Sequence, residues 1–122
     1  MSSKEDKDRR KKEKEADIAF SKSVKARDFW QCAICNSHEN LHCHHILPRE
    51  RRDLRHDFLN AITLCCLHHK FSLEISPHKN AFEFFVWLER NRPQQFEYLK
   101  GKVKMSNILI FHVNEDVQQY VL

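Results

Sequence analysis

The sequence predicts an α+β domain in which two short strands and several helices are organised around bound metal. Histidines and cysteines gather between residues 32 and 69, where two pairs of candidate metal ligands flank a His-His doublet. The same stretch alternates apolar and polar residues in two places, as short strands do. The composition of one Gly, three Pro and nine Phe disfavours a turn-rich all-β fold and favours mainly helical packing.

The length of 122 residues is that of one domain with a moderate core. A formal charge of +4 and a pI near 8.9 permit a polyanionic partner but do not identify one. No apolar run is long enough to cross a membrane, and the N-terminus is charged where a secretory signal is apolar. We therefore expect a cytoplasmic protein without membrane contact, in whose reducing surroundings the cysteines and histidines indicate metal more than disulfides.

The first fifteen residues carry seven Lys or Arg against five Asp or Glu. We expect residues 1–15 to form a flexible charged arm, either frayed or the solvated start of a helix. A further alternative places this arm along DNA phosphates. From residue 16 the apolar spacing predicts a basic amphipathic helix over residues 16–28, so the single folded domain is expected over residues 16–122.

Cys32 and Cys35 have the spacing of a zinc knuckle. Two thiolates at this spacing bind one tetrahedral ion only if the chain turns tightly, and the Asn after Cys35 tolerates the left-handed conformation that ends such turns. Cys65 and His68 form a second pair further along the chain, and together the four residues predict a structural zinc site. The alternative is a set of buried free cysteines, as we expect for the two remaining thiols, Cys43 and Cys66.

Alternating residues predict a strand over residues 41–46, which Pro48 ends. Residues 48–57 are polar and predict a loop. A second strand is predicted over residues 60–65, and a helix over residues 68–75 that ends before Pro77. This order of strand, loop, strand and helix places four polar side chains within reach of one another: His44, His45, Asn60 and His69.

At these spacings the four residues resemble the motif of the HNH endonucleases of the ββα-metal (His-Me finger) superfamily, in particular its small zinc-containing, phage-type members. The resemblance covers about residues 30–75, and the aromatic-rich helix that follows is similar more loosely. The chain departs from the family pattern at His68, which stands where a cysteine is usual, and at His44, where Asp is frequent.

The resemblance implies a ββα-metal finger core with a zinc knuckle, between a basic N-terminal helix and aromatic-rich C-terminal helices. It also implies a role for each motif residue. His45 is the general base, His44 and His69 bind the catalytic metal, and Asn60 tethers the loop that carries the base. His69 and Asn60 thus belong to the expected catalytic set together with His45.

Phosphodiester hydrolysis needs an activated water, neutralised phosphate charge and a stabilised leaving oxygen. A histidine with an ordinary pKa near 6.5 can take the proton of that water at neutral pH. Two imidazoles without an obvious carboxylate are softer ligands than an oxygen-only site. We therefore expect one catalytic divalent cation, Mn²⁺ ahead of Mg²⁺, with Ni²⁺, Co²⁺ or Zn²⁺ as further candidates, and no small-molecule cofactor.

The loop that follows the expected base carries Arg49, Arg52 and Arg55. These arginines either contact DNA phosphates, with Arg49 and Arg55 preferred, or form a solvated face with the acidic residues between them. Nothing in the sequence indicates base-specific contacts.

Residues 76–122 are expected to extend the core. Aromatic residues crowd a predicted helix over residues 79–91, and a short helix is predicted from Pro93 to Gly101. We expect both helices to pack in the core rather than to stack on bases. Ile108 to Val113 predicts a strand that either covers the core or pairs across a dimer.

Together, these expectations predict a metal-dependent DNA endonuclease, an HNH phosphodiester hydrolase. It is expected to act in the cytoplasm or, for a phage-encoded protein, in the host cytoplasm. A monomer that nicks DNA and a homodimer that cuts both strands both stay open. The alternative function is that of a catalytically inactive zinc module that binds nucleic acid as an accessory or regulatory protein.

Overall fold

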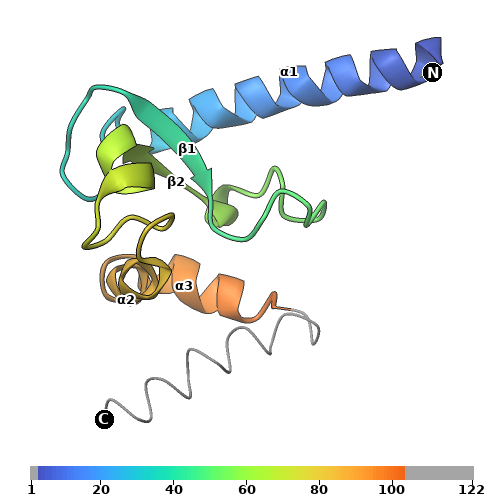
Figure 1. Ribbon diagram of the computed structural model, residues 1–122. Helices are drawn as coiled ribbons and strands as arrows, with labels where there is room; N and C mark the ends of the chain where they lie inside the picture. Colours follow the sequence, from blue (N-terminus) through green and yellow to red (C-terminus); the bar gives the residue numbers. More distant parts are fainter. Residues whose placement is uncertain (1–2, 104–122) are drawn as a thin grey trace.

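A two-stranded sheet lies between one long helix and two short helices (Figure 1). The computed structural model describes residues 3–103; the strand predicted over residues 108–113 lies outside this range. In chain order the elements are α1 (Lys4–Arg27), β1 (Leu41–His45), the 3-10 turn η1 (Phe58–Asn60), β2 (Ala61–Cys65), the π-helical turn η2 (Leu67–Phe71), α2 (Ala81–Asn91) and α3 (Pro93–Lys100). This mixture of helices and a small sheet agrees with the predicted α+β class. Across residues 3–103, no helix has both the length and the apolar character needed to pass through a membrane.

Helix α1 begins at Lys4, so residues 4–15 form the solvated start of a helix, the second of the two alternatives for the charged arm. The Ser3 hydroxyl caps the helix by accepting a hydrogen bond from the Asp6 N–H at 3.1 Å. Lys, Arg and Glu have high helix propensity, and the acidic residues of the first turn complement the helix dipole. The N-terminal turns extend away from the rest of the molecule (Figure 1).

Strands β1 and β2 pair antiparallel, with Leu41 opposite Cys65 and His45 opposite Ala61. Both predicted strands are confirmed to within one residue. Every residue of β2 is buried, because α1 covers one face of the hairpin and α2 and α3 cover the other. Phe20 and Val24 of α1 pack on the first face, against Ala61.

The second face of the sheet carries the larger apolar cluster. Ile62 and Leu64 of β2 pack there with Phe84 and Leu88 of α2 and with Leu99 of α3, and all five are almost completely buried. Burial of an aliphatic or Phe side chain contributes about 1.5–3 kcal/mol each. The predicted helices over residues 79–91 and from Pro93 are confirmed to within two residues, and their apolar positions form the core as expected.

The helix predicted over residues 68–75 is wrong beyond Phe71, because the chain makes only a π-helical turn and then bends back. The Ser72 N–H donates to the Leu67 carbonyl at 2.7 Å, a five-residue spacing that ends the turn. Ser76 is fully buried, and its hydroxyl donates to the His69 carbonyl at 2.9 Å and accepts from the His78 N–H at 3.2 Å. This hydroxyl folds the segment between η2 and α2 back onto η2.

Asp28, at the end of α1, connects all three layers. Its carboxylate accepts hydrogen bonds from Arg27, from the Thr63 N–H of β2 at 3.0 Å and from Arg92 at 3.3 Å. The side chain is 4 % exposed. Burial acts to raise the pKa of Asp28, but its hydrogen bonds and the nearby guanidinium charges outweigh burial and lower the pKa below its ordinary value.

We predict that Asp28→Asn destabilises the fold by about 2–3 kcal/mol, because it removes the charge that compensates the Arg27 and Arg92 guanidiniums. Urea unfolding followed by circular dichroism measures this loss. The matched control is Asp6→Asn, which removes an exposed ion pair with Arg9. Exposed pairs contribute at most about 1 kcal/mol, so an equal loss in both variants would contradict the role of Asp28.

The same carboxylate predicts a pH dependence. Because the pKa of Asp28 is lowered by folding, its stabilisation is complete above the unfolded-state pKa of about 3.9 and is lost as the pH falls below that value. The unfolding midpoint of the wild type should therefore decrease more steeply between neutral pH and pH about 3 than that of Asp28→Asn.

Candidate functional site

Three cysteines and one histidine form a cluster at the end of the hairpin. The ligand atoms of Cys32, Cys35, Cys65 and His68 all lie within 4.8 Å of one another. Cys35 Sγ is 3.7 Å from Cys65 Sγ, and His68 Nδ1 is 3.8 Å from Cys32 Sγ and 3.3 Å from Cys65 Sγ. Tetrahedral zinc bonds of about 2.3 Å to sulfur and 2.0 Å to nitrogen separate the ligand atoms by roughly 3.5–3.8 Å. The cluster therefore has the spacing needed to bind a metal ion such as zinc.

Local backbone geometry positions the first pair of this cluster. Asn36 has a left-handed conformation with φ 64°, and its N–H donates to the Cys32 carbonyl at 2.8 Å. The Ala33 N–H donates to the Thr63 carbonyl at 2.9 Å, which joins the turn to β2. Burial raises the pKa of the Cys65 thiol to about 11, so metal binding there is coupled to release of the thiol proton.

A second cluster consists of His44, His69 and His78, whose ring nitrogens also lie within 4.8 Å of one another. His69 Nε2 is 3.1 Å from His44 Nδ1 and 3.1 Å from His78 Nε2. A ring nitrogen carries either one proton or one lone pair, so His69 Nε2 can make one good hydrogen bond, not two. Nitrogens bound to one ion at about 2.1 Å lie roughly 3.0–3.4 Å apart. The three imidazoles thus have the spacing of a metal-binding triad.

The environment of this triad favours neutral imidazoles. Burial, followed by the neighbouring His69 and His78, lowers the pKa of His44 to about 3. Burial and the adjacent histidines likewise lower the pKa of His69 to about 4. His44 also contacts the ring of Phe84 edge-on at 5.6 Å, on the α2 side of the sheet. Neutral imidazoles keep the lone pairs that metal ions require.

His78 is not among the residues that the sequence predicts for a site. It is exposed and precedes α2 by only a few residues. Only the turn around Ser76 brings it back to His69, whose carbonyl accepts from the same hydroxyl that accepts from the His78 N–H. No spacing rule in the sequence signals this contact, since His78 lies beyond the end of the helix predicted over residues 68–75.

His45, the predicted base, lies on the other side of the strand from His44, because successive side chains of a strand point to opposite faces. Its ring packs on Phe20 of α1 at 5.7 Å. His45 Nε2 is 2.9 Å from the Arg55 carbonyl. Because a carbonyl only accepts, Nε2 carries the proton and Nδ1 keeps the lone pair. Burial lowers the pKa of His45, in part opposed by this hydrogen bond.

Asn60 is fully buried and fixes both ends of the loop that follows β1. Its Oδ1 accepts from the Leu47 N–H at 2.7 Å, and its Nδ2 donates to the carbonyls of Leu47 and Leu54 at 3.0 and 3.1 Å. These bonds hold the loop whose Arg55 carbonyl contacts His45.

Two of the loop arginines form ion pairs with acidic residues of α1. Arg55 forms an ion pair with Asp17 of α1 at 2.6 Å and lies 3.5 Å from Glu13, while Arg52 pairs with the same Glu13. Arg49 is exposed, and within residues 3–103 no ion pair involves it. Helix α1 places both Glu13 and Asp17 beside the loop.

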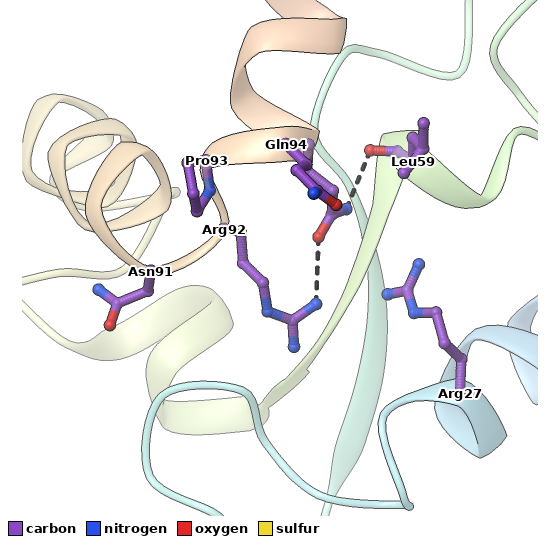
Figure 2. A pocket seen from close by; sticks show the side chains of 7 residues that line it. Arg27, Leu59, Asn91, Arg92, Pro93 and Gln94 are labelled. Carbon is purple, nitrogen blue, oxygen red and sulfur yellow. Dashed lines mark hydrogen bonds between the residues drawn. The ribbon is translucent and has the colours of Figure 1, made fainter.

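A shallow pocket of about 360 Å³ lies elsewhere, at the start of α3 (Figure 2). Its arginines are already engaged: Arg92 donates to Gln95 at 3.1 Å, and Arg27 donates to the Phe58 carbonyl at 2.5 Å. No residue of either histidine or cysteine cluster lines this pocket. We therefore place the candidate site at the two clusters and not at the pocket.

Comparisons with protein-family models, with curated proteins and with solved structures each found no match to this chain.

We predict that the protein retains one tightly held metal ion and that Cys35→Ser loses it, with a clear fall in melting temperature, because metal binding stabilises the fold. Cys35 is exposed, so its replacement leaves the apolar core intact. Elemental analysis after extensive dialysis and thermal unfolding measure the two effects. The control is Cys66→Ser, which changes a cysteine outside both clusters. Equal metal content in both variants would show that the cluster does not bind metal.

Proposed function

We propose that this protein is a metal-dependent endonuclease of the HNH type that hydrolyses phosphodiester bonds in DNA. The observation that carries the proposal is the convergence of His44 Nδ1 and His78 Nε2 on His69 Nε2, each at 3.1 Å. Directly beside this triad in the chain stands His45, whose ring is held by a loop that a buried asparagine fixes.

The two clusters would have separate roles. We assign the Cys3His cluster to a structural zinc ion, since thiolates and one imidazole at tetrahedral spacing are the usual ligands of such sites. The histidine triad offers three protein ligands, which leaves coordination positions for water and phosphate, as catalytic metal sites require. A divalent cation bound there would neutralise charge on the scissile phosphate and on the departing oxygen.

His45 would act as the general base through a defined atom. Its Nε2–H donates to the Arg55 carbonyl at 2.9 Å, so Nδ1 is the nitrogen that accepts a proton from water. The backbone hydrogen bond fixes the ring and its tautomer, and it stabilises the imidazolium that forms. Asn60 would serve as a positioning residue, because its bonds to Leu47 and Leu54 hold the loop that carries the Arg55 carbonyl.

Contacts to the DNA backbone would come from the exposed surface beside this loop. Arg49 is exposed and close enough to His45 for its charge to help lower the pKa of that histidine. It is therefore the loop arginine that we assign to a phosphate. Arg55 acts through its carbonyl on His45 and through its ion pair with Asp17, and not through a free guanidinium.

We predict that the protein nicks or linearises supercoiled plasmid in Mn²⁺ and not in EDTA. His45→Ala should lower the cleavage rate by about 10²–10⁴-fold, the usual contribution of a general base. The matched control, His38→Gln, changes a histidine of the zinc knuckle that belongs to neither cluster and should keep the rate.

Metal content and melting temperature of each variant separate loss of chemistry from loss of fold. Unimpaired cleavage by His45→Ala would remove the assignment of the base. DNA binding without cleavage in every metal tested would instead support the alternative of a non-catalytic nucleic-acid-binding zinc module.

A further prediction concerns the choice of cation. The triad supplies imidazole nitrogens, and borderline ions bind nitrogen better than Mg²⁺, which prefers oxygen ligands. At matched concentrations Mn²⁺, Co²⁺ or Ni²⁺ should support faster plasmid cleavage than Mg²⁺. Equal or faster cleavage in Mg²⁺ would contradict a nitrogen-only protein ligand set.

A further inference from the structure

A fourth histidine contacts the triad from outside. His42 Nδ1 lies 2.9 Å from His69 Nδ1, the ring nitrogen that does not face the triad. The other nitrogen of the same ring, His69 Nε2, faces His44 and His78. His69 is therefore engaged at both of its ring nitrogens, on one side by the triad and on the other by His42.

The hairpin explains why His42 reaches this place. His42 and His44 are two residues apart on β1, opposite Leu64 and Ile62, and so project to the same face of the sheet. Their rings contact His69 at 5.1 and 4.9 Å, and the ring of His42 stands nearly perpendicular to that of His69, at 82°. His69, on the short turn η2, is thus held between two side chains of one strand.

The number of protons on the two imidazole rings limits how His42 and His69 can form this hydrogen bond. Two ring nitrogens at 2.9 Å share one proton, so one of them donates and the other accepts. If His42 Nδ1 donates, the proton of neutral His69 sits on Nε2 and blocks the triad. If His69 Nδ1 donates to His42, then His69 Nε2 carries a lone pair directed at His44 and His78. Only the second arrangement leaves a ligand nitrogen for a metal ion.

We propose that His42 is a positioning residue that accepts the Nδ1–H hydrogen bond of His69 and so fixes the ring orientation and tautomer that direct His69 Nε2 to a metal ion. This inference rests on the proposed metal-binding triad and adds an outer partner to it. Outer hydrogen-bond partners of metal-ligating histidines contribute about 10–100-fold to metal affinity.

The experiment measures Mn²⁺ binding by calorimetry to zinc-loaded protein, without DNA. His42→Leu removes the acceptor and should weaken Mn²⁺ binding by about 10–100-fold. His42→Asn places an oxygen at the position of the Nδ1 atom and should keep affinity close to that of the wild type. A second readout, long-range ¹⁵N–¹H spectra of the histidine rings, should show the Nδ1–H tautomer of His69 in the wild type and in His42→Asn, but a mixture in His42→Leu.

His44→Ala distinguishes failure of this inference from failure of the proposed function. If His44→Ala leaves Mn²⁺ binding unchanged, the triad is not a metal site, and the inference falls with it. If His44→Ala abolishes binding while His42→Leu binds like the wild type, only the role of His42 is overturned. Loss of binding in His42→Leu and His42→Asn as complete as in His44→Ala would make His42 a direct ligand, which also overturns the positioning role. Thermal unfolding of each zinc-loaded variant checks that the fold is retained.

Discussion

The register of the β1–β2 hairpin fixes the side of the sheet on which each histidine of the candidate site lies. With His44 opposite Ile62 and His45 opposite Ala61, the two histidines of the doublet occupy different faces of the sheet. One face turns His42 and His44 toward η2 and α2, and the other turns His45 toward α1. A slip of one residue would exchange these faces and dismantle both arrangements together. The packing of β2 between helices opposes such a slip, since it would remove Ile62 and Leu64 from the apolar cluster that they form with α2 and α3.

The two clusters meet in consecutive residues, because His68 belongs to the Cys3His cluster and His69 to the histidine triad. Both lie on η2, a turn too short to hold its shape through its own hydrogen bonds. An ion bound by His68 would anchor this turn to the knuckle and to the end of β2, and so set the position of His69. On the other side, Ser76 joins the His69 carbonyl to the segment that carries His78. A metal ion in the Cys3His cluster would therefore support the position of the histidine triad.

In this small core, buried polar side chains connect several segments of the chain through hydrogen bonds. Asn60, Asp28 and Gln95 bridge segments far apart in the sequence, and Ser76 closes a shorter turn onto His69. All buried side-chain polar atoms in the described part of the chain have a hydrogen-bond partner. Such groups stabilise only when fully paired, so they restrict the backbone to one arrangement. Asn60 shows how such pairing reaches the candidate site, because the loop that it holds carries the carbonyl that contacts the ring of His45.

Local sequence patterns are sufficient to predict the two strands, helix α3 and the grouping of the cysteine ligands. Alternating apolar and polar residues predict both strands, and Pro93 and Gly101 predict the bounds of α3. The spacing of the ligand residues groups four of them into one predicted metal site: Cys32, Cys35, Cys65 and His68. The remaining features depend on tertiary contacts. The tertiary structure made residues 4–15 helical beside the arginine loop, paired Arg52 and Arg55 with acids of α1, and ended the predicted helix at Phe71. It also brought His78 and His42 to His69. These outcomes depend on contacts between different segments of the folded chain. A buried hydroxyl or an ion pair there stabilises one of several conformations whose free energies local propensity leaves nearly equal.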